Sequence, residues 1–183
     1  MIHYVCKYTP VEIFAGFHEK CAPLDAMPEN FDQADKVAHA NLCGFGRSVI
    51  QAVMEGKVEE LILVNCCDTM RRSYDIIKAT GKCKFLYMLD LPHEDEECER
   101  INFAGKIQAL KEAYGKYSGR EFDRAAFLAA FSRRVELTEP YVGLLGVRIS
   151  PALHEMIQKS MRMPVQNLKK KKKTTLKSMP ISL

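Results

Sequence analysis

The chain has 183 residues, of which 47% are hydrophobic and 27% charged, and its 27 Lys and Arg against 23 Asp and Glu give a formal net charge of +4. This composition is ordinary for a globular protein and excludes the disordered, collagen-like and disulfide-scaffold classes. The length suits one α/β domain, or one domain with an incomplete second.

The positive charge lies wholly at the C-terminal end of the chain. Six of the 27 basic residues and no acidic residue occur from Pro164 onward, which leaves 21 basic against 23 acidic residues in 1–163 and a charge of −2 there. The run of lysines at 169–173 has neither interleaved aromatic residues nor amphipathic spacing. We therefore expect a solvated, disordered tail at 164–183 that binds neither nucleic acid nor membrane.

Targeting signals are not visible in the sequence. No apolar run approaches the roughly 20 residues that a membrane helix needs, and the first residues lack the basic and apolar regions of a secretory signal. We expect a cytoplasmic protein. Because that compartment is reducing, the seven cysteines indicate metal binding, catalysis or burial in preference to disulfides.

Helical and apolar segments alternate along the first half of the chain. A strand buried on both faces is expected at 61–64, where four apolar residues are consecutive, and the next helix is expected to end at Gly81. In chain order we expect a helix over 10–20, a strand over 22–24, a loop over 27–32, a helical stretch from about 32 that breaks at 43–46, a helix over 47–56, the strand at 61–64 and a helix over 69–80.

The second half continues the alternation with a buried strand at 85–89, helices over 100–117 and 120–136, and an apolar run at 141–149. Strands that alternate with helices at this spacing predict a doubly wound parallel sheet. Ligands of such sheets gather at the carboxyl ends of the strands. The sequence thus places 65–68 and 90–93 at the functional edge.

One candidate thiol, Cys43, lies in the segment HANLCGFGRS. The flanking glycines allow a tight bend between two helices, which would expose the thiol or a backbone amide to a ligand. The residues Gly44 to Gly46 could instead cradle a phosphate, but no strand precedes them and the full G-x-G-x-x-G spacing is missing. A simple turn between helices is the third interpretation.

Two further candidates, Cys66 and Cys67, follow the buried strand directly. Cys67 adjoins Asp68 and precedes a helix whose N-terminal dipole would stabilise a thiolate. Because side chains alternate in an extended segment, we expect one of the two thiols to face the edge and the other the core. Cys21 and Cys83 border apolar runs and are expected to be small buried hydrophobic residues.

These segments resemble the 2-hydroxyacyl-CoA dehydratase D-component family, which includes benzoyl-CoA reductase subunits. The resemblance lies in Tyr4, Pro10 and Glu12, in HANLCGFGRS, in VNCCDTMRRSYD and in FLYMLDLPH, and it extends over about residues 4–163. It implies flavodoxin-like α/β domains, two to a subunit, with an oxygen-sensitive [4Fe-4S] cluster between them. Three cysteines hold that cluster and leave one iron open to the substrate thioester oxygen.

Carried over to this sequence, the resemblance makes Cys43 and Cys67 cluster ligands, with Cys66 as the alternative to Cys67. Asp68 and Arg71 match the surrounding motif without a role that the sequence explains. The implied activity is that of a lyase, which removes water from a 2-hydroxyacyl-CoA thioester through a ketyl radical. The implied partners are a second dehydratase subunit and an ATP-dependent iron–sulfur activator. No general base is assigned, because His39 and His93 are equal candidates.

The resemblance also predicts the domain organisation. The third family cysteine belongs to a second domain, whereas here the chain runs into KKKKKTTLKSMPISL. We expect an α/β cluster-binding domain over 1–138, the truncated beginning of a second similar domain over 139–163, and too few ligands for this chain to hold a stable cluster alone. The alternatives are a non-catalytic accessory α/β domain that docks on a full-length subunit, and a nucleotide-binding flavodoxin-like module that uses 44–46.

Overall fold

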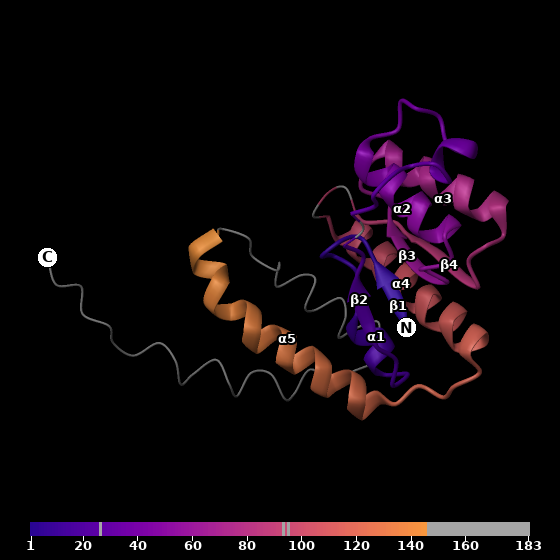
Figure 1. Cartoon of the computed structure of the whole chain (residues 1–183). Coiled ribbons are helices and arrows are strands. Elements are labelled where there is room, and N and C mark those ends of the chain that lie inside the picture. The colour runs from indigo at the N-terminus through magenta and orange to yellow at the C-terminus, as the bar shows by residue number, and fades with distance from the viewer. Residues whose placement is uncertain (26, 93, 95, 146–183) are drawn as a thin grey trace, which may run out of the picture.

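The computed structural model describes residues 1–25, 27–92, 94 and 96–145. Its centre is a parallel four-stranded sheet with the order β2-β1-β3-β4 (Figure 1). The strands are β1 (Ile2–Tyr4), β2 (Cys21–Pro23), β3 (Glu60–Val64) and β4 (Phe85–Leu89). This order matches the first four strands of the flavodoxin-like order 2-1-3-4-5. The parallel α/β fold that the sequence predicts is confirmed.

The strand β1 lies inside the sheet, although the sequence analysis assigns it no strand. It pairs with β2 on one side and with β3 on the other, where His3 lies opposite Leu61 and Tyr4 opposite Ile62. Three residues are too few to show a period of two. Only the tertiary pairing, which buries Ile2 completely, identifies this segment as a strand.

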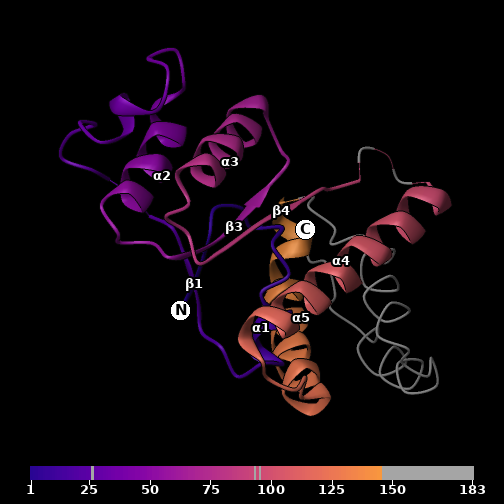
Figure 2. The same ribbon diagram turned by 90° about the vertical axis from the view of Figure 1, so that its right-hand side faces the viewer.

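Helices cover both faces of the sheet (Figures 1 and 2). In β3, Leu61 and Leu63 belong to one core and Ile62 and Val64 to the other, because successive side chains of a strand point to opposite faces. The first core includes residues of the short 3-10 helix η1 (Ala34–Lys36), α2 (Gly44–Met54) and α3 (Asp68–Thr80). The second includes residues of α1 (Glu12–Ala15), α4 (Glu97–Ser118) and α5 (Arg124–Leu145).

Two predicted helices are much shorter in the structure. The segment 10–20 contains only the four residues of α1, and the stretch from 32 to 42 contains only η1. The Gln51 side chain of α2 explains the second difference, since its Oε1 accepts the N–H groups of Gln33 at 3.0 Å and Ala34 at 2.7 Å. These bonds hold the segment against α2, and only isolated α-helical bonds form within it, from the Asp35 N–H to the Phe31 carbonyl and from the Ala38 N–H to the Ala34 carbonyl.

The long helices α4 and α5 each have 22 residues. Phe103, Ile107, Leu110 and Tyr114 are buried at helical spacing on α4, so this helix packs one side against the sheet. No helix in the described ranges is long and apolar enough to cross a membrane.

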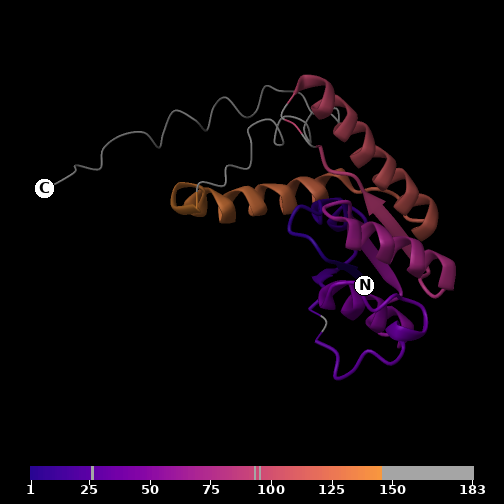
Figure 3. The same ribbon diagram turned by 90° about the horizontal axis from the view of Figure 1, so that it is seen from above.

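Helix α5 extends past the point where the sequence analysis ends the predicted helix, and its far end projects from the body (Figure 3). The apolar run at 141–149, which the sequence analysis places at the start of a second unit, continues α5 as helix over 141–145. A short apolar run fits a helix as well as a strand, and periodicity alone does not separate the two. Residues 146–149 and the tail at 164–183 lie outside the described residues, and the domain boundary at 138 stays a prediction.

A buried ion pair attaches α5 to α1. The Glu12 side chain is 5% exposed, and its Oε1 lies 2.7 Å from Nη1 of Arg134. The Arg134 guanidinium also donates to the carbonyl oxygens of Lys7 at 2.8 Å and Thr9 at 3.3 Å. The loop after β1 is thus fixed to α5.

Candidate functional site

The N-termini of α2 and α3 meet at the carboxyl edge of the sheet. Both helices follow a parallel strand and run back along the sheet, so both begin at this edge. A Cβ atom at Gly46 would overlap the Thr69 methyl group and lie 3.2 Å from Oγ of Ser73. The first turns of the two helices can approach this closely because Gly46 has no side chain. Figure 2 shows the two helices side by side on one face of the sheet.

Cys43 is the N-cap residue of α2. Its backbone is extended, with φ −60° and ψ 153°, and its Sγ accepts the N–H of Gly46 at 3.5 Å. This hydrogen bond holds the pKa of Cys43 below its ordinary value, and the Thr69 hydroxyl and the Phe45 N–H act in the same direction. The expected break at 43–46 is thus the first turn of α2. An exposed thiol with N–H donors at a helix N-terminus is suited to hold its charge as a ligand.

Cys67 is the N-cap residue of α3, and it follows Cys66 at the end of β3. Both thiols are exposed, so the expectation that one of the pair faces the core is wrong. The strand ends at Val64, and a bend in which the Cys66 N–H donates to the Val64 carbonyl at 2.8 Å ends the alternation. Burial raises the pKa of Cys66 above its ordinary value, and Cys67 and Cys6 add to the rise.

A polar network fixes the segment that bears these two cysteines. Asn65 donates from Nδ2 to Oδ1 of Asp90 at 2.9 Å, and Oδ1 of Asn65 accepts from Nε of Arg71. Nζ of Lys106 lies 3.4 Å from the second Asp90 oxygen. The network links β3 to α3, β4 and α4. The prediction that Asn65 and Asp90 share one edge is confirmed, and Arg71, unexplained in the sequence, holds the segment in place.

Lys106 and Cys6 are missed by the sequence analysis. Lys106 lies on a helix with no local signal for an edge position. Cys6 is half-buried in the loop after β1, and its place at the carboxyl edge could not be known while β1 was not identified. A thiol directly after a strand is the signal that would have found it, as it found Cys66 and Cys67.

The remaining cysteines have simpler environments. Burial raises the pKa of Cys21 to about 12 and that of Cys83 to about 11, which agrees with the expectation that both act as small hydrophobic residues. Both are half-buried rather than fully enclosed. Cys98 is exposed, and its Sγ lies 3.4 Å from a Glu96 carboxylate oxygen.

The two histidines that the sequence analysis weighs as bases gain no support. Nδ1 of His39 accepts the N–H of Asn41 at 3.1 Å, which fixes this exposed ring within its own turn. His93 lies outside the described residues. No general base is therefore assigned at this edge among the described residues.

Cys43 and Cys67 have the chemical character that ligands of an iron–sulfur cluster need. Cys43 and Cys67 are exposed thiols at two helix N-termini whose first turns are in contact, and the helix dipoles there favour negative charge. Within the residues that the structure describes, no three or more His, Cys, Asp or Glu side chains are arranged to hold a metal ion. This part of the chain thus offers two of the three thiolates that the family resemblance implies.

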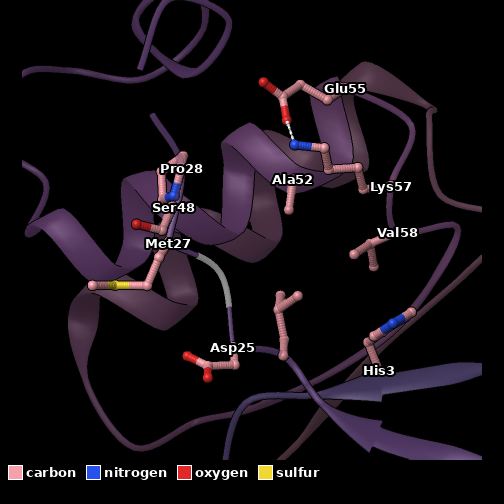
Figure 4. Close-up of a pocket in the computed structure, with 10 residues that line it drawn as sticks. His3, Asp25, Met27, Pro28, Ser48, Ala52, Glu55, Lys57 and Val58 are labelled. Atoms are coloured by element: carbon pink, nitrogen blue, oxygen red, sulfur yellow. Dashed lines mark ion pairs between the residues drawn. The ribbon is translucent and has the colours of Figure 1, made fainter. Parts of the chain in front are cut away.

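A shallow pocket of about 250 Å³ lies beside α2 and does not include these thiols (Figure 4). The two charged groups on its upper rim, Glu55 and Lys57, pair with each other at 2.6 Å. It is lined by His3, Leu24, Asp25, Met27, Pro28, Ser48, Ala52, Glu55, Lys57 and Val58.

The fold and this edge define a flavodoxin-like α/β protein with paired thiols where the strand order of its sheet reverses. The chain belongs to the family described as 2-hydroxyglutaryl-CoA dehydratase, D-component, which matches residues 6–179. The match includes Cys43 and Cys67 and continues through the lysine run, past residue 163 where the sequence analysis ends the resemblance. No curated protein matches the chain at a significant level. Membership places the chain among dehydratases and implies a partner subunit and an acyl-CoA substrate.

Proposed function

We propose that this chain is a subunit, or part of one, of a [4Fe-4S] 2-hydroxyacyl-CoA dehydratase, in which Cys43 and Cys67 supply cluster thiolates. The observation that supports it best is the contact between Gly46 and Thr69, which brings the two cysteine-capped helix N-termini together. The place also agrees with the rule that ligands of open α/β sheets bind outside the carboxyl ends of the strands, where the strand order reverses.

The chain's own residues have defined tasks in this proposal. Gly46 sets the spacing of the two helices, its N–H and the Thr69 hydroxyl stabilise the Cys43 thiolate, and Arg71 holds the Cys67 segment through Asn65. When bound, the cluster supplies one electron to the thioester carbonyl, which makes loss of the 2-hydroxyl group possible through a ketyl radical. The third thiolate comes from outside the described residues.

The proposed assembly includes a second dehydratase subunit, an ATP-dependent iron–sulfur activator that delivers the electron, and a CoA thioester as substrate. We place it in the cytoplasm, where an oxygen-sensitive cluster is compatible with reduced cysteines. The division into a cluster-binding domain over 1–138 and the beginning of a second domain belongs to the same proposal.

Anaerobic reconstitution of the full chain with iron and sulfide tests the ligand assignment. Because the described residues of this chain supply only two of the three thiolates, we expect loosely bound iron and a weak, broad sulfur-to-iron charge-transfer absorption, both lost in Cys43→Ala and in Cys67→Ala. Cys66→Ala and Cys98→Ala are the matched controls, and both should keep the absorption. If Cys66→Ala removes the band and Cys67→Ala does not, the ligand is Cys66. If all four variants keep it, the assignment of both ligands is wrong.

The second candidate is an accessory α/β domain without catalytic activity. It is favoured because the described residues bring together no group of three metal ligands, whereas a cluster in this family needs three thiolates. Such a domain would co-purify with a full-length dehydratase subunit and contain no iron. A nucleotide site at 44–46 is less favoured, because these residues form the first turn of α2 and the Gly46 N–H is already bonded to Cys43. It predicts ATP or flavin binding that does not change in Cys43→Ala.

A further inference from the structure

Three thiols gather where β1 and β3 end. Cys66 and Cys67 follow β3, and Cys6 follows the neighbouring strand β1. Because β1 and β3 pair in parallel, their carboxyl ends are neighbours, and the three thiols lie at the same edge of the sheet. The proposed cluster uses Cys67 alone, which leaves Cys66, an exposed thiol next to a ligand, without a task.

We propose that Cys66 and Cys67 are a reversible dithiol pair, which a peroxide oxidises to a disulfide. The pair itself is independent of the function proposed above. One consequence rests on that function: the disulfide would remove Cys67 as a ligand and thereby prevent the cluster from binding.

The chemistry of the step balances with peroxide as the oxidant. One thiolate attacks a peroxide oxygen, the O–O bond breaks, and a sulfenic acid and hydroxide form. The second thiol attacks the sulfenic sulfur, the S–O bond breaks and water leaves. Two thiols and one hydrogen peroxide thus give one disulfide and two water molecules. A dithiol reductant returns both cysteines to thiols.

The geometry favours a disulfide that is accessible to oxidant and easily reduced. The bend after Val64 leaves both side chains exposed, so oxidant and reductant reach them. Neighbouring Cα atoms are about 3.8 Å apart across a trans peptide, whereas Cα atoms of most disulfides are about 4.4–6.8 Å apart. A bond between neighbours is therefore strained, and strained, exposed disulfides have the higher reduction potentials of labile, regulatory bonds.

Peptide mapping of the full chain, oxidised with one equivalent of hydrogen peroxide in the absence of iron, tests the pair. Trypsin releases Cys66 and Cys67 together in the peptide 58–71, and Cys6 in the peptide 1–7. We expect 58–71 to become two hydrogen atoms lighter and to return to its original mass with dithiothreitol. A cross-link between the two peptides, or an unchanged 58–71, would overturn the proposal.

Two variants sharpen the test. Cys66→Ser should form no disulfide in 58–71 and should accumulate a sulfenic acid on Cys67 that dimedone traps. Cys98→Ser, altered outside this edge, should behave as the unaltered chain, and circular dichroism checks that both variants fold. A Cys66→Ser chain that shows no trapped sulfenic acid on Cys67 would contradict the order of steps.

Iron uptake separates this proposal from the function on which its consequence rests. If the reduced chain binds iron and the peroxide-treated chain binds at least tenfold less, both hold. If the disulfide forms and the reduced chain binds no iron, the cluster assignment fails and the dithiol pair stands. If the oxidised chain binds iron as well as the reduced chain does, the disulfide does not control the ligand and that part of the proposal is wrong.

Discussion

The methyl group of Thr69 occupies the space in which a side chain at Gly46 would lie. The hydroxyl of the same Thr69 side chain also helps to lower the pKa of the Cys43 thiol. The contact therefore connects the packing of two helices to the environment of a candidate ligand.

Gly46→Ala should separate the first turns of α2 and α3. We expect the free energy of unfolding to fall by about 1–3 kcal/mol, as is typical of overpacking, and the thiol of Cys43 to react with iodoacetamide at a changed rate. Gly44→Ala is the control, because nothing lies within 4 Å of a Cβ at that position. Urea denaturation should show no loss for Gly44→Ala, and equal losses in the two variants would contradict the close approach.

Arg71→Ala should loosen the segment that bears Cys66 and Cys67. Arg71 is half-exposed, so we expect a loss of only about 1 kcal/mol in stability. Asn65 would lose a hydrogen bond from Arg71 and keep the one that it donates to Asp90. Alkylation of both thiols, followed by mass spectrometry, should become faster than in Arg72→Ala, an exposed neighbour on the same helix. Unchanged rates in Arg71→Ala would show that Asp90 alone holds the segment.

Arg134→Ala should destabilise the fold more than any surface change. It leaves the buried Glu12 carboxylate without its ion pair, and we expect a loss of about 2–4 kcal/mol, because part of the guanidinium is solvent-exposed. Arg133→Ala, exposed on the same helix, should change the stability by less than about 0.5 kcal/mol. The double variant with Glu12→Gln should recover part of the loss, because no charge then stays buried. Failure to recover would indicate that the bonds to the loop carbonyls matter more than the charge.

Asp123 should make stability depend on pH. Its carboxylate accepts the N–H groups of Ala126 and Ala125 at the start of α5, and these bonds lower its pKa from the ordinary 3.8. A lowered folded-state pKa stabilises the protein above the ordinary value, and the contribution is lost as pH falls through the folded value. Asp123→Ala should therefore melt at a lower temperature at pH 7, and its difference from the unaltered chain should shrink below pH 4.

Asp123→Asn is the control for that titration. Asparagine caps helices about as well as aspartate and has no charge to lose. Its melting temperature should lack the pH dependence that Asp123 adds. Thermal melts of the three chains between pH 3 and 7 check this, and parallel curves for all three would show that Asp123 does not couple to folding.

The sequence predicts well the elements whose local pattern agrees with their tertiary surroundings. The run Leu61–Val64 is buried on both faces, and α3 ends at Gly81 with a φ of 64°, as expected. The failures occur where distant contacts decide. The segment of η1 is fixed by Gln51 from another helix, and β1 exists only through its two neighbours.

The candidate site divides in the same way. The resemblance points to Cys43 and Cys67 as candidate ligands, and Cys67 also directly follows a strand. Both signals are properties of nearby residues. The contact of Gly46 with Thr69 and the link from Asn65 to Lys106 through Asp90 join residues far apart in the chain. These contacts cannot be inferred from the spacing of residues along the sequence.

The interior position of β1 has a consequence for the order of folding. Residues 2–4 can pair with β2 once residues 21–23 have been synthesised. Their backbone groups on the other side stay unpaired until residues 60–64 of β3 have been synthesised. During translation, this nascent strand therefore presents open backbone groups to any neighbouring chain, as unpaired strand edges do in aggregation-prone intermediates. Slow elongation between residues 23 and 60 should lower the yield of the protein.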